Sequence, residues 1–314
     1  MYKRFKRLNK RWQWFITLIL IICLVLLIWL TILYWNVQST SQTMYASVHD
    51  EHSVLRVEPI QLDNDEPFSV LLLGVDKRAE DSGRSDTILV ATVNPKEKTT
   101  KMLSVPRDTF TQISGTTKTD KINHAYAFGG LKTTKETIEQ LLNIPIDYAV
   151  AINMEGFVQT INLLGGVEVE NPFSFTYEGE HFEQGPLKLD GELALKYVRM
   201  RYEDPQGDFG RQNRQKQVLQ SAMDKAFSLQ SIFQLQSMLE IIGENVETNV
   251  TLGEMIKLNR IYKSSTKDNE QLYINVGQGK LINGIYYFMA NEQHLKDTQS
   301  ILQAHLMLNE QEME

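Results

Sequence analysis

The chain has 314 residues, and its apolar fraction of 42% is enough to bury a sizeable core. The formal net charge is −7 at pH 7, which argues against the basic surface that nucleic-acid-binding proteins use, so no nucleic-acid partner is expected. Cys23 is the only cysteine, so the chain cannot form an internal disulfide or a zinc site built from several cysteines.

The N-terminus combines a basic tail with a long apolar run. Residues 1–11 hold six Lys or Arg residues and no acid, and residues 12–48 carry no charge. An apolar stretch of about 20 residues is long enough to cross a bilayer, and a basic flank marks the cytoplasmic side. The sequence therefore predicts a cytoplasmic tail, a single transmembrane signal-anchor at 12–35 and an extracellular domain held at the cell membrane. A cleaved signal peptide is the disfavoured alternative, because its apolar region would be shorter.

Strand and helix patterns alternate after a polar stretch over residues 36–66, which is expected to be a tether with little structure. Short apolar runs between turn residues predict strands at 68–75, 87–93, 101–105, 148–152, 271–276 and 285–289. Helical spacing, capping boxes and glycine stops predict helices opening at Thr133 and Thr251 and others at 157–164, 192–198, 211–229 and 292–306. Residues 277–280 are expected to form a turn. This alternation predicts an α/β fold, an α-β-α sandwich around a central mixed sheet.

Charged residues gather at the ends of the first three predicted strands. They are Asp76 and Arg78 after the first strand, Arg84 and Asp86 before the second, and Arg107 and Asp108 after the third. If the first two strands are antiparallel neighbours, all six side chains meet at one edge of the sheet. Two carboxylates there would suit one Mg²⁺, with waters and a substrate phosphate completing its coordination. Solvated loop charges are the alternative.

A second charged group precedes and opens the predicted helix at 211–229. Its members are Arg199, Arg201, Asp208, Arg211 and Arg214. Helical spacing predicts that Arg211, Arg214, Gln215, Val218 and Ala222 share one face. A helix N-terminus favours phosphate, and guanidinium groups bind phosphate oxygens in pairs. The face suits a pyrophosphate head followed by an apolar tail. An ordinary amphipathic helix with a solvated arginine end is the alternative.

Six motifs carry these residues in a fixed order over about residues 68–226: LLLGVDKR, GRSDTILVATVNP, SVPRDTF, KINHAYAFGG, LDGELALKYVRMRY and DFGRQNRQ. The combination resembles the LytR–CpsA–Psr family of Gram-positive wall enzymes. The resemblance implies a ligase that transfers wall teichoic acid or a similar glycopolymer from a polyprenyl-pyrophosphate carrier to peptidoglycan, with the lipid in an apolar tunnel. It makes 67–240 the catalytic domain and 241–314 a C-terminal α/β extension packed on it.

The resemblance also implies roles for individual residues. Asp76 and Asp86 would bind Mg²⁺. The pyrophosphate would be surrounded by Arg78, Arg107, Arg199, Arg201, Arg211 and Arg214. Further substrate contacts are expected from Arg84, Lys121, Gln215 and Val218. Asp108 is one candidate for the general base, whereas His124 is expected to be a structural or rim residue.

The expected reaction is a Mg²⁺-assisted phosphotransfer in which a wall sugar hydroxyl attacks the polymer-side phosphorus and polyprenyl phosphate leaves. Two other classes stay open. A membrane-anchored regulator or attenuator is disfavoured because the cytoplasmic tail at 1–11 is too short for a helix-turn-helix. A module that binds lipid pyrophosphate or wall glycan without turnover is compatible with the same residues.

Overall fold

The computed structural model describes most of the chain beyond the predicted tether. The described residues are 58–77, 82–226, 245–265 and 268–308, with isolated positions at 17, 19, 24, 31, 53, 55, 56 and 243. The predicted cytoplasmic tail, nearly all of the predicted anchor and the tether up to residue 52 lie outside them. Within the part of the chain that is described, no helix combines the length and the apolar character needed to cross a bilayer.

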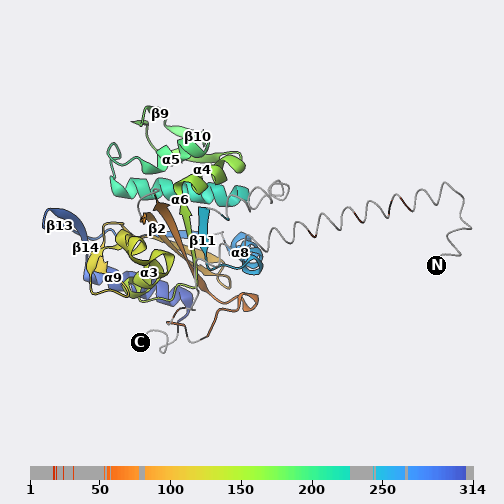
Figure 1. The fold of residues 1–314 in the computed structure, drawn as a ribbon, viewed down its shortest axis with the longest axis horizontal. Helices are drawn as coiled ribbons and strands as arrows, with labels where there is room; N and C mark the ends of the chain where they lie inside the picture. Colours follow the sequence, from red (N-terminus) through yellow and green to blue (C-terminus); the bar gives the residue numbers. More distant parts are fainter. Residues whose placement is uncertain are drawn as a thin grey trace, which may run out of the picture.

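A mixed sheet of six strands forms the middle layer of the described fold (Figure 1). Its order is β11 (Val246–Thr248), β6 (Tyr148–Asn153), β1 (Phe68–Asp76), β2 (Arg84–Asn94), β3 (Thr99–Ser104) and β12 (Asp268–Tyr273). β2 is antiparallel to β1 and β3, and β11 is antiparallel to β6. β6 runs parallel to β1, and β12 runs parallel to β3. The predicted α/β fold with a mixed sheet and antiparallel first strands is confirmed.

Helices cover both faces of this sheet. One face packs against α3 (Ala125–Leu142) and α9 (Glu292–Leu306), and the other is covered by α4 (Met154–Leu163), α5 (Gly191–Arg199), α6 (Asp208–Ala226) and α8 (Leu252–Ser265). Figure 1 shows α6 above the sheet and α3 with α9 below it. Because strand side chains alternate, Leu71 and Leu73 join the core under α3, whereas Leu72 and Leu89 face the other side.

A small lobe extends the α4–α6 layer. The sequence patterns did not predict its strands. It contains β7 (Val167–Asn171), β8 (Phe175–Tyr177), β9 (Glu180–Phe182) and β10 (Gly185–Leu189). Phe175 stacks on Phe182 and on Tyr197 of α5, with ring centroids 4.8 and 5.8 Å apart. These strands are short and alternate with exposed residues, so their apolar runs were too brief to stand out in the sequence.

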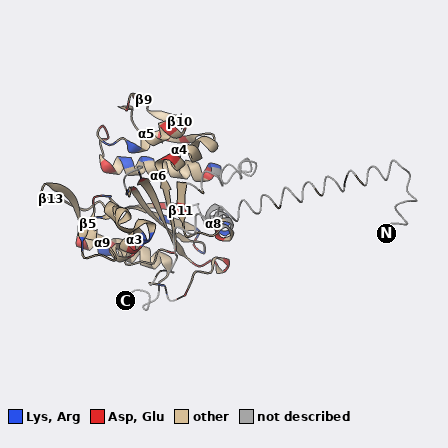
Figure 2. Cartoon of the chain, viewed as in Figure 1, with Lys and Arg blue, Asp and Glu red and all other residues tan. Residues whose placement is uncertain are grey.

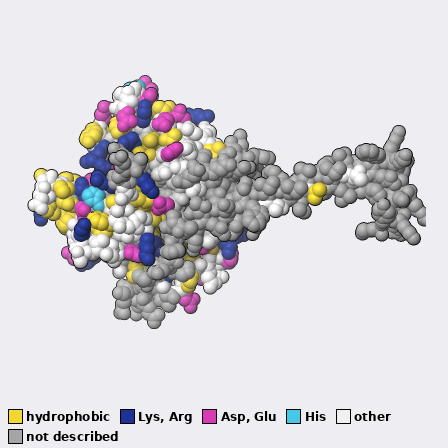
Figure 3. Space-filling model, viewed as in Figure 1, with side chains coloured by type: hydrophobic (Ala, Val, Ile, Leu, Met, Phe, Trp, Pro, Cys, Tyr) yellow, Lys and Arg dark blue, Asp and Glu magenta, His cyan; other side chains and the backbone are white. Residues whose placement is uncertain are grey.

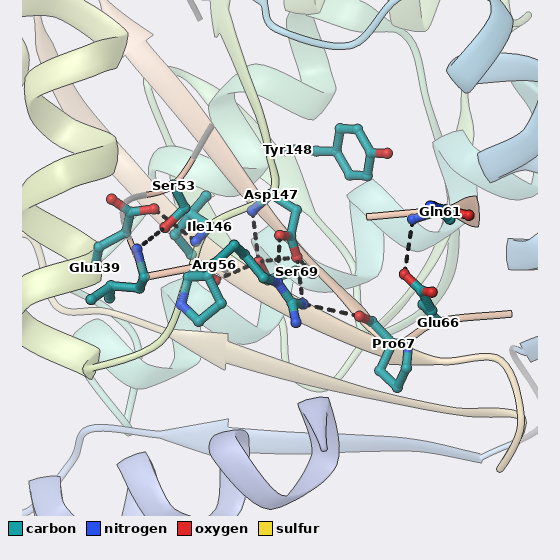
Figure 4. Close-up of polar contacts among 12 residues, drawn as sticks. Ser53, Arg56, Gln61, Glu66, Pro67, Ser69, Glu139, Ile146, Asp147 and Tyr148 are labelled. Carbon is teal, nitrogen blue, oxygen red and sulfur yellow. Dashed lines mark hydrogen bonds and ion pairs between the residues drawn. The ribbon is translucent and has the colours of Figure 1, made fainter. Parts of the chain in front are cut away.

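The chain before β1 is docked on the end of the sheet (Figure 4). Arg56 Nε and Nη2 donate to the carboxylate of Asp147 at 3.0 and 3.1 Å, and Nη2 also donates to the Pro67 carbonyl at 3.0 Å. The same carboxylate accepts the Ser69 backbone N–H at 2.9 Å. Leu62, in the 3₁₀ turn η1 (Leu62–Asn64), is buried. The expectation of little structure up to residue 66 is therefore wrong for this last part, because its polar side chains find partners on the fold.

Several helix boundaries follow the capping signals. Asp190 Oδ1 accepts the Leu193 N–H at 2.9 Å and starts α5, and Thr251 with Glu254 forms the predicted capping box before α8. α9 has the predicted bounds. By contrast, α3 begins at Ala125 and not at Thr133, because a kink at Gly129 and Gly130, where Gly130 has φ 65°, joins an extra N-terminal turn to it.

Residues 277–280 form a strand and not the expected turn. β13 (Gly277–Ile282) pairs with β14 (Ile285–Ala290), and the turn lies at Asn283 and Gly284, which have φ values of 51° and 79°. Asn-Gly is a common pair at such a hairpin turn. The glycines of β13 permit this pairing, since a Cβ on Gly279 would lie 2.6 Å from the Tyr286 ring. In the sequence alone, the two glycines at 277 and 279 indicated a turn.

Candidate active site

A cavity of about 460 Å³ lies between the sheet and helices α4, α5 and α6. Its apolar walls include Leu72 and Leu89 from the sheet, Phe157 and Ile161 from α4, Leu195 and Val198 from α5, and Val218, Leu219 and Ala222 from α6. Its charged residues are Asp86, Arg107, Arg199, Arg201 and Arg211. Enclosed apolar walls with a few convergent charges are typical of a site for an amphipathic ligand.

Helix α6 shows how the cavity changes along its length. Arg211, Gln215, Val218 and Ala222 line it in that order, and they span about 16 Å at the rise of an α-helix. The guanidinium group therefore lies at one end and apolar side chains continue toward the other. Figure 2 shows the basic residues that α5 and α6 contribute above the sheet. Figure 3 shows basic side chains gathered on the visible face between the α6 layer and the α3 layer.

A β-bulge brings Asp86 into the cavity. The pairing of β1 with β2 steps from Gly74–Thr87 to Val75–Ser85, so Asp86 is the extra residue on β2. Regular alternation would have put Asp86 and Thr87 on opposite faces, yet both line the cavity. Bulges often re-aim a side chain next to an active site, and this one carries a carboxylate to the arginine end.

Two arginines at this end are held by carboxylates. Arg107 Nη1 lies 3.0 Å from Asp86 Oδ2, and Arg211 Nη2 lies 2.7 Å from Asp208 Oδ1. Burial opposes the charged form of Arg107, but Asp86 and Asp108 outweigh it and raise its pKa. Burial lowers the pKa of Arg211, with Asp208 opposing the shift and Arg107 adding to it. Arg107 and Arg211 are therefore close enough to repel each other. An anionic ligand bound between them would offset this repulsion.

Arg211 also keeps an unused donor. Its side chain is only 7% exposed, and its Nε is buried without a hydrogen-bond partner among the described residues. A buried donor left unpaired costs about 1–3 kcal/mol, so a ligand oxygen at this position would gain that amount. Among the described residues, the carboxylates nearest Arg199 and Arg201 are Glu178 and Asp208, each at 3.9 Å, and both arginine side chains are partly exposed. Three guanidinium groups are therefore available to a phosphate-rich ligand.

Comparison with known proteins identifies the family of this chain. The model of the LytR_cpsA_psr family matches residues 31–304. The chain belongs to the LytR–CpsA–Psr family. A relative from Bacillus licheniformis, named polyisoprenyl-teichoic acid–peptidoglycan teichoic acid transferase TagU, is 42% identical over 296 residues, which cover 94% of this chain and 96% of the relative. The Bacillus subtilis protein of the same name is also 42% identical, with the same coverage. The chain is accordingly an enzyme, a transferase of the LytR–CpsA–Psr family.

Solved structures of the family share the fold. A crystal structure of Bacillus subtilis TagV is 40% identical, with a TM-score of 0.68 over 78% of this chain and 99% of that one. A structure described as TagT bound to LIIa-WTA is 36% identical, with a TM-score of 0.70 over 83% and 98%. An Enterococcus faecalis protein described as a transcriptional regulator is 39% identical, with a TM-score of 0.71 over 80% and 91%.

The LytR–CpsA–Psr motifs bring seven of the predicted site residues into the cavity wall: Asp86, Arg107, Arg199, Arg201, Arg211, Gln215 and Val218. Other predicted residues lie outside that wall. Asp76 and Arg84 lie opposite each other in the register of β1 and β2, at the ends of these strands. Arg78 falls outside the described residues. Lys121 Nζ lies 2.6 Å from Asp108 Oδ1, so these two form an ion pair behind Arg107.

Arg214 is the clearest difference from the predicted face of α6. Its guanidinium is buried and does not line the cavity. It pairs with Asp204 and donates to the carbonyls of Tyr197 and Met200 at 3.0 and 2.5 Å. It also lies over the rings of Tyr197 and Phe175. The expectation that Arg214 contacts the ligand beside Arg211 is wrong. The two residues lie only about 60° apart on the helix, but the Arg214 side chain is turned to Asp204 and does not line the cavity. Arg214 holds α5, α6 and the loop between them together.

Two contributors to the site were missed in the sequence. Asn123, in the motif KINHAYAFGG, donates from Nδ2 to Asp86 Oδ1 at 3.4 Å. Phe157 of α4 lines the apolar part of the cavity. The motif itself was a signal for Asn123, since a buried asparagine beside charged residues needs polar partners. Phe157 gave no signal, because a core aromatic and a ligand-contacting aromatic look the same in sequence.

Proposed function

We propose that this chain transfers an anionic glycopolymer, wall teichoic acid or a similar polymer, from a polyprenyl-pyrophosphate carrier to peptidoglycan. The observation that carries the proposal is the cavity along α6, where an arginine end continues directly into an apolar interior. A phosphate site alone would not need the apolar continuation, and a lipid site alone would not need the arginines. The names of the TagU relatives support the polymer and the acceptor.

The arginines would act on the diphosphate. Arg107, Arg201 and Arg211 line the cavity. They would face the negative charge that develops when the bond between the polymer-side phosphorus and the bridging oxygen breaks. Fixed guanidinium groups stabilise such charge without reorganising during the reaction. Val218, Leu219 and Ala222 would bury the first part of the polyprenyl chain and orient the diphosphate toward Arg211.

The donor set also fits Mg²⁺. Among the described residues no group of three or more His, Cys, Asp or Glu side chains is arranged around one point. Mg²⁺ is often held by one or two carboxylates together with substrate phosphate and waters. Asp86 faces the cavity. Its Oδ2 is paired with Arg107, and among the described residues its Oδ1 has only the 3.4 Å contact from Asn123. Asp86 in the cavity wall would hold the ion together with Asp76, which lies outside that wall at the end of β1 next to the bulge. The bound ion would neutralise charge on the diphosphate.

The proposal includes a membrane setting. Residues 12–35 would form a single-pass anchor with the N-terminus in the cytoplasm, and the domain from 67 onward would lie outside the cell, where peptidoglycan is. The composition of residues 1–48 supports this arrangement. A C-terminal reporter that works only outside the cell is expected to be active. Activity of a reporter restricted to the cytoplasm would contradict it.

The full-length protein in detergent provides the test of transfer. Incubation with a polyprenyl-pyrophosphate-linked saccharide and a peptidoglycan oligomer is expected to release polyprenyl phosphate and to label the oligomer. Binding of the donor without release would instead favour a binding module. Asp86→Asn is expected to lower release more than tenfold at limiting Mg²⁺ while the thermal midpoint stays unchanged, because the carboxylate faces the cavity and not the core.

A further inference from the structure

A hydrogen-bonded pair of side chains, His124 and Asp120, flanks Asn123, which contacts Asp86 at the charged end of the cavity. His124 ends the 3₁₀ turn η2 (Ile122–His124), and its Nδ1 lies 2.9 Å from Asp120 Oδ2 in β5 (Thr119–Lys121). The other oxygen of Asp120 accepts the Tyr287 hydroxyl of β14 at 3.3 Å. The His124 Nε2 has no hydrogen-bond partner among the described residues, and the side chain is 26% exposed. A carboxylate that orients an imidazole and leaves its second nitrogen free is the arrangement of a general base.

The η2 turn is fixed to the residues that line the cavity. Asn123, which precedes His124, donates its backbone N–H to the Arg107 carbonyl at 3.2 Å and its side-chain amide to Asp86. Ile122 donates its N–H to the Thr109 carbonyl at 2.8 Å, and β14 joins the same loop through Phe288 N–H and the Asp108 carbonyl at 2.9 Å. The histidine is therefore held one residue away from groups that contact Asp86 and Arg107.

Asp108, the earlier candidate for the base, is poorly suited to that role. Its carboxylate lies 2.6 Å from the Lys121 ammonium and 3.9 Å from the Arg107 guanidinium. Both carboxylate oxygens therefore already face a cation, which leaves neither directed at an acceptor hydroxyl. Asp120 is engaged on both oxygens. Burial opposes its ionised form, but hydrogen bonds from His124 and Lys121 outweigh it and lower the pKa of Asp120.

Asp120 can therefore remain an anion beside the imidazole. The charged and titratable groups around His124 are Asp120 on β5, its neighbour Lys121 paired with Asp108, and Tyr287 on β14. Of these, only Asp120 is hydrogen-bonded to the ring, so it sets the orientation of the imidazole. Elsewhere in the described chain, His305 is bonded through both ring nitrogens to Thr92 and Thr99.

We propose that His124 is the general base that takes the proton from the acceptor hydroxyl, with Asp120 as its positioning residue. This inference rests on the proposed function. The acceptor O–H bond breaks and its proton goes to His124 Nε2. The acceptor oxygen forms a bond to the polymer-side phosphorus, and the bond from that phosphorus to the bridging oxygen breaks. Polyprenyl phosphate leaves with the electron pair, and the imidazolium then gives its proton to solvent.

His124→Asn is the decisive variant, because the asparagine amide can still donate to Asp120 from the Nδ1 position while Nε2 is lost. A positioned base contributes about 10²–10⁴-fold, so kcat for transfer is expected to fall by at least about 100-fold. If the wild type shows a rise of kcat with pH on the acid side of its profile, that rise is expected to be absent from the variant. The dissociation constant of polyprenyl pyrophosphate and the thermal midpoint are expected to stay within about twofold and about 2 °C of the wild type.

His181→Asn is the matched control. His181 on β9 also contacts a carboxylate, Glu183, at 3.3 Å, but it lies in the small lobe at the other end of the molecule from α3 (Figure 1). It is expected to leave kcat and its pH profile unchanged. Asp120→Asn is expected to lower kcat while the dissociation constant of polyprenyl pyrophosphate stays unchanged, because the carboxylate that orients the imidazole is gone.

The outcomes separate this inference from the function on which it rests. Full-length wild type that releases no polyprenyl phosphate with any peptidoglycan acceptor would overturn both. Active wild type together with His124→Asn of equal kcat and unchanged pH profile would overturn the inference alone. A His124→Asn variant that loses donor affinity and thermal stability in proportion to its activity would also overturn it, because the side chain would then be structural.

Discussion

Two sides of helix α6 carry arginines of the same motif in opposite circumstances. On the cavity side, Arg211 has one carboxylate partner, Asp208, and an unused buried donor. On the other side, Arg214 is fully bonded to Asp204 and to two carbonyls, and it packs over two aromatic rings. The comparison teaches that the motif DFGRQNRQ contains both a ligand-binding residue and a residue that builds the site around it.

The largest expected effect comes from removing the structural arginine. Arg214→Ala would leave Asp204 buried without its partner and two carbonyls unsatisfied, so the free energy of unfolding should fall by about 3–5 kcal/mol. Urea unfolding of the full-length protein in detergent measures it. A variant of unchanged stability that merely binds donor more weakly would break the comparison, because Arg214 would then act on the ligand.

The cavity-side arginine should show the reverse pattern. Arg211→Ala removes charge-assisted hydrogen bonds to the diphosphate, each of which contributes about 1.5–3 kcal/mol, so the dissociation constant of polyprenyl pyrophosphate should rise by about 10- to 100-fold. Stability should change by less than about 1 kcal/mol, since the unpaired Nε disappears as well. Lys225→Ala, at the far end of α6, is the control for lost charge. Equal losses of affinity in both variants would point to general electrostatic attraction.

The apolar part of the same side should discriminate by chain length. Ala222 is partly buried and lines the cavity, so Ala222→Asp would place a carboxylate where the lipid lies. Affinity for long polyprenyl pyrophosphates should fall several-fold, and affinity for a short isoprenyl pyrophosphate should change little. Gln220→Asp, which lies on a different side of α6, controls for added negative charge. A loss that is equal at every chain length would make this side a phosphate cradle only.

The smallest effect concerns a third side of α6, where Lys216 is buried against β3 and β12. Burial lowers the pKa of Lys216 to about 8. Among the described residues, its Nζ lies 3.5 Å from the carbonyls of Met102 and Leu272 and 3.9 Å from the centre of the Tyr273 ring. Because the folded pKa is below the unfolded one, the charged lysine destabilises the fold at pH 7, and this cost fades as pH rises from about 8 toward 10.

Lys216→Met should therefore stabilise the protein at pH 7 by about 1–2 kcal/mol, allowing for the carbonyl and ring contacts that the ammonium loses. The advantage over wild type should shrink by pH 10. Urea unfolding at the two pH values measures the difference. An advantage that is the same at both would assign the effect to packing and not to charge.

Local signals determined much of the secondary structure. The apolar run 68–75, the cap at Asp190 and the box of Thr251 with Glu254 fixed their elements because each depends on residues close in sequence. The glycines of β13 misled the prediction, because their use as space for Tyr286 depends on a partner strand. The strands of the small lobe were not predicted, because they are short and their buried residues alternate with exposed ones.

For the site, the sequence by itself identified the residue types that a diphosphate needs and the motifs that carry them. Only the tertiary structure decided which of them face the cavity. The bulge that turns Asp86 inward arises from a register shift between β1 and β2, and the burial of Arg214 arises from packing with Tyr197 and Asp204. Both depend on contacts between distant segments, so the spacing of charges along one strand or one helix could not assign them.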